Sequence, residues 1–290
     1  MPPHRSVSAD ITRVFWRLAS FAFLSVALIV ASGFVLKPVF PNGLPFGRAG
    51  QVLYLLVLSL AVGLAHLAAA FWEKSGDWAV LGFAPAGWAP KRALLGFVGG
   101  VLVLTAPAGA LLAIGFARLQ PMPTGAWGTF ALNVLVVGAL AALVDTLAFR
   151  GYLHGLVERR WGSWIAVAVS MVLFAALRAL AAPISVASIV GALAMGAFLG
   201  AVRARSEGIA APWLAQLGMI WLQGAALHVR VPGLDLESPP NYGLVLGPPA
   251  FVTGAGWGLA GGLAAALCLF GAAFVLMRPL PYVPPPLARP

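Results

Sequence analysis

Six ionisable side chains fall inside long apolar stretches of this 290-residue chain, and they are the first candidates for chemistry: Arg17, His66, Asp145, Arg150, His154 and Arg178. Ionisable groups within membrane-spanning helices are rare and by default mark functional sites. Arg17 lies within one turn of the end of its stretch, so it can reach the membrane interface and receives no role. His66 stands alone on its stretch and is best interpreted as a core histidine whose hydrogen bonds are satisfied.

Asp145 and Arg178 are expected to form a buried ion pair. Asp145 lies 16 residues before Trp161, and Arg178 lies 16 residues after Gly162, with a basic turn between them. At about 1.5 Å per residue, each is roughly 24 Å from the turn, so an antiparallel helix pair brings them to the same depth. An isolated charge in the bilayer costs about 2.5–3.5 kcal/mol or more, so the two should pair. Arg150 competes for Asp145 but can reach water or headgroups, and Arg178 is therefore preferred.

The elements that position these residues are predicted to be membrane-spanning helices. The chain is 61% hydrophobic and only 9% charged, whereas a soluble domain carries about 25% charged residues. A bilayer is spanned by about 20 apolar residues. Eight such runs fall at about 14–36, 52–72, 93–117, 127–157, 163–182, 184–202, 209–228 and 251–277. The sequence therefore predicts an all-α fold, a polytopic integral membrane protein with one transmembrane domain (1–290) of about eight helices.

The basic residues predict the orientation of this bundle, because Lys and Arg gather on the cytoplasmic side. With the N-terminus inside, only five of the 18 Lys and Arg residues fall outside: Lys37, Arg48, Arg118, Arg178 and Arg230. We therefore expect both termini in the cytoplasm and the protein in the cell (plasma) membrane. The net charge of +10 is attributed to this bias and not to nucleic-acid binding. The single cysteine excludes an intrachain disulfide.

The segments between and beyond the runs have their own signals. Residues 73–92 hold turn-forming Pro and Gly with Trp78 and Trp88, which predicts a short interfacial element, and residues 229–250 are expected to form an extracytoplasmic loop. The proline-rich tail 279–290 should be extended and mobile. Small residues at every fourth position, in Ser188–Gly200 and again in Gly254–Gly262, predict close helix packing within the molecule.

Three segments resemble the motif blocks of the intramembrane CAAX-processing and bacteriocin-processing metalloprotease family (CPBP, also called Abi). They read Asp145-Thr146-Leu147-Ala148-Phe149-Arg150-Gly151, Phe174-Ala175-Ala176-Leu177-Arg178 and Ala211-Pro212-Trp213-Leu214-Ala215-Gln216. The family blocks read Glu-Glu-x-x-Phe-Arg-Gly, Phe-x-x-x-His and His-x-x-x-Asn or Asp. The resemblance covers about residues 140–226. It implies an eight-helix bundle in a bacterial inner membrane, and a zinc endopeptidase in which histidines hold the metal and a glutamate activates its bound water.

The framework of these blocks is kept, and the metal-binding residues are not. Carried over residue by residue, the framework falls on Phe149, Arg150, Gly151 and Phe174, all unchanged. The remnant catalytic and ligand positions fall on Asp145 and Thr146 (the two glutamates), Arg178 and Gln216 (the two histidines) and Ile220 (the Asn or Asp).

The substituted residues cannot perform the family's chemistry. A guanidinium has no lone pair to give a metal and would repel it. Gln216 is a poor zinc ligand, Ile220 is none, and Thr146 cannot replace a glutamate as general base. Three protein ligands are usual at a catalytic zinc site, so Asp145 alone makes none. No histidine pair has the i, i+4 spacing of a helical zinc motif, and we predict no metal and no cofactor.

The leading functional hypothesis is accordingly a catalytically inactive member of this family that acts as a membrane binding or regulatory protein. Its expected partners are membrane lipids and a membrane protein or peptide, with no nucleic acid. The alternative is an active intramembrane metalloprotease of the CAAX-processing or bacteriocin-immunity type, with an atypical zinc site that uses Asp145 with His66 or His154. A third hypothesis is a small transporter gated by Asp145 and Arg178. Whether the protein is an enzyme stays open at this stage.

Overall fold

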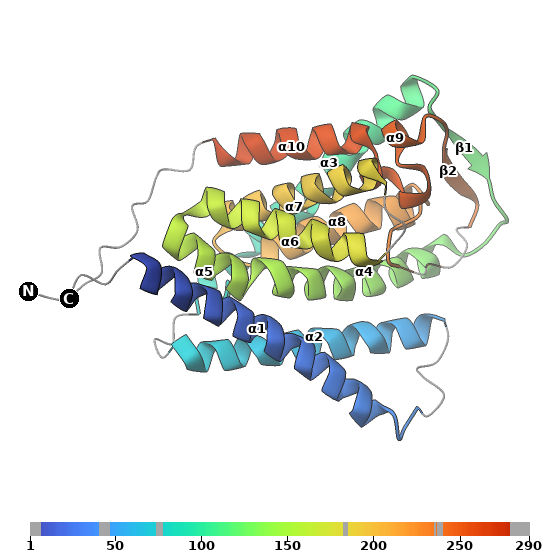
Figure 1. The fold of residues 1–290 in the computed structure, drawn as a ribbon. Coiled ribbons are helices and arrows are strands. Elements are labelled where there is room, and N and C mark those ends of the chain that lie inside the picture. The colour runs from blue at the N-terminus through green and yellow to red at the C-terminus, as the bar shows by residue number, and fades with distance from the viewer. Residues whose placement is uncertain are drawn as a thin grey trace, which may run out of the picture.

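Long apolar runs fold into helices because a backbone in lipid must satisfy its own hydrogen bonds. The computed structural model describes residues 7–40, 47–73, 78–181, 185–234, 236 and 240–278. The long helices lie alongside one another as a bundle (Figure 1). They are α1 (Val7–Leu36), α2 (Arg48–Glu73), α3 (Pro90–Ala113), α4 (Trp127–Arg150), α5 (Tyr152–Trp161), α6 (Ser163–Ala181), α7 (Val186–Ser206), α8 (Ala210–Trp221) and α10 (Leu263–Met277).

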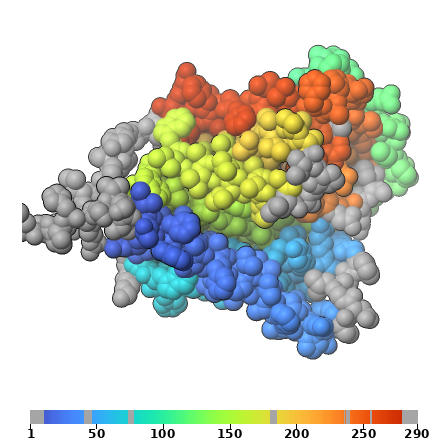
Figure 2. All heavy atoms as spheres, in the orientation of Figure 1, coloured from blue at the N-terminus to red at the C-terminus, as the bar shows by residue number. Residues whose placement is uncertain are grey.

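The helices have the length and the surface of membrane spans. Five helical segments are long and apolar enough to cross a bilayer: Ile11–Leu36, Arg48–Glu73, Pro90–Ala113, Trp127–Trp161 and Val186–Ser206. Ser163–Ala179 and Leu263–Met277 are shorter apolar helices. On α1, Phe23 and Phe34 are 76% and 72% exposed, and this helix lies on the outside of the molecule (Figure 2). The predicted helical, polytopic integral membrane fold is confirmed.

One predicted span, 127–157, is divided into two helices at Gly151. The backbone of Gly151 leaves the helical region (φ −82°, ψ −122°), so α4 ends at Arg150 and α5 begins at Tyr152. The Nε2 atom of His66 on α2 reaches into this break and accepts a hydrogen bond of 3.2 Å from the Tyr152 amide. A Cβ at Gly151 would lie 2.1 Å from that nitrogen. The close packing of α2 against Gly151 accounts for the break. Hydropathy does not predict such packing.

The last predicted span, 251–277, is also shorter than expected. It consists of α9 (Ala250–Thr253), two 3-10 turns at Ala255–Trp257 and Leu259–Gly261, and then α10. Gly254 and Gly258 have φ of 89° and 70°, in the left-handed region that glycine tolerates. The predicted helical stripe of glycines from Gly254 to Gly262 is therefore wrong, because two of its members form turns.

A small sheet was missed by the sequence prediction. Strand β1 (Ala117–Pro121) pairs antiparallel with β2 (Tyr242–Leu246), with Ala117 opposite Leu246 and Pro121 opposite Tyr242. The run 93–117 therefore ends in a strand, and the loop 229–250 contains one. Pro85–Trp88 forms a 3-10 helix within the predicted interfacial segment. The tail 279–290 lies outside the described residues.

Glycines bring the helices that surround the candidate site into backbone contact. Gly96 and Gly100 of α3 face the backbone of Ala211 and Ala215 on α8, where an added Cβ would lie 2.3 and 1.9 Å from a carbonyl oxygen. In the other stripe, Ser188–Gly200, Gly196 and Gly200 face α6 less closely, and an added Cβ would lie 2.9 Å from the backbone of Met171 and 3.3 Å from the Val167 side chain. That stripe packs within the molecule, as the sequence predicts.

Candidate functional site

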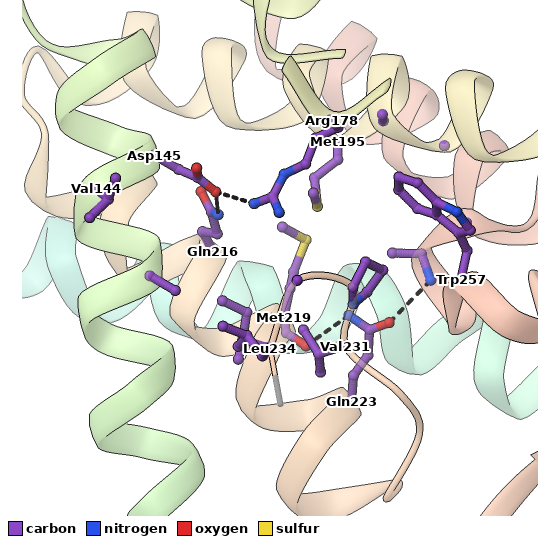
Figure 3. A pocket seen from close by; sticks show the side chains of 18 of the residues that line it. Val144, Asp145, Arg178, Met195, Gln216, Met219, Gln223, Val231, Leu234 and Trp257 are labelled. Carbon is purple, nitrogen blue, oxygen red and sulfur yellow. Dashed lines mark hydrogen bonds and ion pairs between the residues drawn. The ribbon is translucent and has the colours of Figure 1, made fainter. Parts of the chain in front are cut away.

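Three helices carry the polar residues of the site to one point near the centre of the bundle. Asp145 lies on α4, Arg178 on α6 and Gln216 on α8. The Nη2 atom of Arg178 forms an ion pair with Oδ2 of Asp145, and the Gln216 amide donates a hydrogen bond of 2.6 Å to the same oxygen (Figure 3). The two charged side chains are 12% and 22% exposed. The predicted Asp145–Arg178 ion pair is confirmed.

The competing cation, Arg150, is fully buried and takes a different position. Its guanidinium lies over the Phe174 ring, 4.5 Å from the centroid, and 5.6 Å from the centroid of Phe149. It donates a long hydrogen bond of 3.4 Å to the backbone carbonyl of Asp145. The expectation that Arg150 could reach water is wrong, because Phe149 and Phe174 enclose it. The framework residues of the first two motif blocks thus form one aromatic and cationic cluster beside the ion pair.

Thr146 and Ile220, the other two remnant positions, contribute no polar contact to the site. Both side chains are buried. The Thr146 hydroxyl has no hydrogen-bond partner within the described residues, and the Ile220 side chain packs toward Gly138 of α4. The structure therefore brings Asp145, Arg178 and Gln216 together by direct bonds, whereas Thr146 and Ile220 lie buried nearby and make no polar bond to them.

A cavity of about 210 Å³ opens beside the ion pair. Its wall is mainly apolar and comes from α2, α4, α6, α7, α8 and the turns that precede α10. Polar groups enter from Asp145, Arg178, Gln216 and Gln223 (Figure 3). Mostly apolar cavities with a few convergent polar groups are typical small-molecule or peptide binding sites.

Gln223 is a cavity residue that sequence reasoning missed. It lies in a π-helical turn, Leu222–Ala226, that continues α8. Its amide oxygen accepts a hydrogen bond of 3.1 Å from the backbone of Ala260, so it holds the turns before α10 against the cavity. The sequence spacing could have identified it. Gln223 follows Gln216 by seven residues, and this spacing of two helical turns places both side chains on one face of a helix.

The residues of the site do not fit a zinc ion. Oδ2 of the Asp145 carboxylate accepts from a guanidinium and from an amide, and neither donor atom has a lone pair for a metal. No group of three His, Cys, Asp or Glu residues in the described part of the chain could hold a metal. The two histidines of the alternative zinc site form hydrogen bonds within the protein instead. His66 bonds to the backbone of Val62 and Tyr152, and His154 bonds to the Ser170 hydroxyl.

A family model matches the segment that carries the polar centre. Residues 127–222 match the family model of the Rce1-like type II CAAX prenyl endopeptidases. The chain carries an Rce1-like domain. The predicted membership in the CAAX protease family is confirmed for this segment, which begins at α4 and ends with α8. No curated protein and no solved structure matches the chain.

The Rce1-like domain contains all three residues of the polar centre. Asp145, Arg178 and Gln216 fall within it, as do Thr146 and Ile220. The cavity also uses side chains outside the domain, including Leu55 and Leu58 of α2 and Trp257 after α9. The matched segment supplies the chemistry of the site, and the flanking elements close it.

Proposed function

We propose that this protein is a proteolytically inactive member of the CAAX-type intramembrane protease family, which binds a membrane-embedded ligand without cutting it. One observation carries the proposal: a guanidinium and an amide occupy the two positions that histidines hold in the family motifs. Both donate to the same oxygen of Asp145. The ion pair replaces the metal as the positive partner of this carboxylate.

With Asp145 bound to Arg178 and Gln216, the site lacks the metal ligands and the general base that peptide hydrolysis requires. A metalloprotease needs a bound metal with an open position and a base that takes a proton from water. Here the Asp145 carboxylate is neutralised by Arg178, and Thr146 stands where the second glutamate would be. A cation entering the site would meet the guanidinium at close range, so Coulomb repulsion opposes metal binding in this low-dielectric setting.

Binding remains possible because the cavity is kept. The Gln216 amide oxygen is buried and has no hydrogen-bond partner among the described residues. Buried polar atoms usually have one, so this oxygen is suited to accept a hydrogen bond from a ligand. The partly exposed guanidinium of Arg178 offers further donors on the same wall. An extended peptide segment has both the N–H and the carbonyl groups that these atoms would bind.

The first test is the zinc content of the detergent-purified protein, measured by elemental mass spectrometry beside a chelator-treated sample. We expect a stoichiometry near zero. The double variant Arg178→His/Gln216→His, which restores the two histidine positions, serves as a positive control and should retain zinc. A stoichiometry near one in the wild-type protein would contradict the proposal.

A proteolysis assay on membrane-anchored peptides tests the same proposal through activity. We expect no cleavage above that of an Asp145→Ala variant. Metal-dependent cleavage by the wild-type protein that is lost in this variant would establish the alternative, an active protease with an atypical site.

A further inference from the structure

A second hollow lies apart from the site described above and shares no residue with it. It is a groove of about 650 Å³ between α3, α7 and α10. Leu102, Phe198 and Leu276 are among its apolar walls. Because α3 and α7 are long and apolar enough to cross a bilayer, we expect the groove beside them to face lipid, and an apolar chain suits its walls.

Glycines form the open part of this groove. At Gly99 on α3 and Gly271 on α10, an added Cβ would meet no atom within 4 Å. These glycines are therefore not required for helix packing, in contrast to Gly96, which lies against the backbone of Ala211. Their missing side chains are what leave the groove empty.

Two arginines stand at one end of the groove, Arg92 at the start of α3 and Arg205 at the end of α7. Arg205 is exposed, and its side chain has no hydrogen bond or ion pair with any residue that the structure describes. Arg92 binds the Ser206 carbonyl at 2.8 Å and Glu207 at 3.2 Å, in both cases through Nη1. The pair with Glu207 is exposed and therefore weak, and the Nε and Nη2 donors of Arg92 stay available to an anion.

The dimensions of the groove match one lipid chain. Arg92 and Val103 both line it, and eleven residues of helix span roughly 16 Å. One leaflet of the hydrocarbon core is about half of the 30 Å total, or roughly 15 Å. A chain that starts at the arginines therefore ends near the bilayer midplane.

We propose that this groove is a specific binding site for an anionic phospholipid, with one acyl chain along Gly99 and Gly271 and the phosphate between Arg92 and Arg205. The guanidinium fork matches the geometry of a phosphate better than an ammonium does. Basic pockets between membrane helices recognise anionic headgroups by this attraction. The site does not depend on whether the protein cuts peptides.

The test is native mass spectrometry of the full-length protein with equal amounts of phosphatidylglycerol and phosphatidylcholine. Two arginines predict a preference of about 30-fold for the anionic lipid. Arg92→Gln/Arg205→Gln should abolish the preference. Gly99→Leu and Gly271→Leu, which fill the groove, should abolish retention of either lipid.

Two variants serve as matched controls. Gly109→Leu also adds a side chain where no atom lies within 4 Å, but outside the groove, and Arg118→Gln removes an exposed arginine of β1. Neither should change lipid retention. Three results would each overturn the proposal. They are equal binding of both lipids, equal lipid retention by Gly99→Leu and Gly109→Leu, and displacement of the lipid by millimolar inorganic phosphate. A thermal melt of each variant separates lost binding from lost folding, and Gly271→Leu replaces Gly99→Leu if that variant does not fold.

Discussion

At the scale of single residues, the Asp145 carboxylate is the group on which the site depends. One of its oxygens accepts hydrogen bonds from Arg178 and from Gln216. Within the bilayer, the charge of Asp145 or of Arg178 would be costly without its partner. Arg178 also lies 5.2 Å from the centroid of the Phe174 ring, which Arg150 covers at 4.5 Å. The unchanged phenylalanine of the second motif block thus contacts two cations, which explains how two arginines are accommodated beside one acid.

Removing one member of the ion pair should cost more than removing both. Asp145→Leu or Arg178→Met alone leaves a charge without its partner, and each should lower the free energy of unfolding by about 3 kcal/mol. The double variant Asp145→Leu/Arg178→Met leaves no charge and should lie within about 1 kcal/mol of the wild-type protein. Chemical unfolding in detergent measures all three.

A control for this cycle is Glu207→Gln, which removes the acid of the exposed Arg92 pair. The Glu207 side chain is 68% exposed, so the loss should stay below about 1 kcal/mol. If the two single changes at Asp145 and Arg178 were additive in the double variant, the pair would not be coupled.

At the scale of the elements, glycines on one face of α3 hold this helix at backbone distance from α8, while Gly99, on a different face of α3, leaves open space. Gly100 and Gly99 are adjacent in sequence and opposite in environment. A Cβ at Gly100 would lie 1.9 Å from the Ala215 carbonyl oxygen, and at Gly99 it would meet nothing. Since α8 carries Gln216, the approach of these two helices sets the position of a site residue.

This difference predicts opposite effects of the same substitution. Gly100→Ala should destabilise the protein by about 1–3 kcal/mol, because α3 and α8 must separate. Gly99→Ala should stabilise it by about 0.5–1 kcal/mol, because alanine has the higher helix propensity. Thermal unfolding of both variants checks the prediction, and equal shifts of their melting temperatures would contradict it.

At the scale of the whole molecule, the bundle begins and ends at the same side. The first residues of α1 and the last residues of α10 lie at one end, and the sheet of β1 and β2 lies at the other (Figure 1). The arginines of the lipid groove, Arg92 and Arg205, belong to the helix ends on the side of α10's last turn. This arrangement suits a protein whose basic side faces an anionic leaflet.

The orientation predicted from the basic residues can be tested by labelling. In a Cys268→Ala background, Thr124→Cys lies in the connection between β1 and α4, and Ala86→Cys lies in the 3-10 helix before α3. A membrane-impermeant maleimide should label the first in intact cells and the second only after permeabilisation. The reverse pattern would place the termini outside.

The sequence by itself determined that most of the chain lies in lipid, where most of the helices fall, and which acid and base pair inside the bundle. Eight apolar runs, about 20 residues each, cannot be buried except in lipid, and the spacing of Asp145 and Arg178 around one turn sets their depths. The three motif blocks also indicated the Rce1-like segment at residues 127–222, because the framework at Phe149, Gly151 and Phe174 is kept even where the ligand positions changed. These features are local or depend on one pair of neighbouring helices, so they can be predicted from the amino-acid sequence.

Only the tertiary structure decided where helices break and where space remains. The break at Gly151 comes from His66, which is 85 positions away in sequence, and the turns at Gly254 and Gly258 depend on φ angles that hydropathy does not encode. The cavity beside Arg178 and the groove above Gly99 are gaps left by several helices at once. The cavity and the groove exist because the side chains around them leave space unfilled. How segments distant in sequence pack together decides where such space remains.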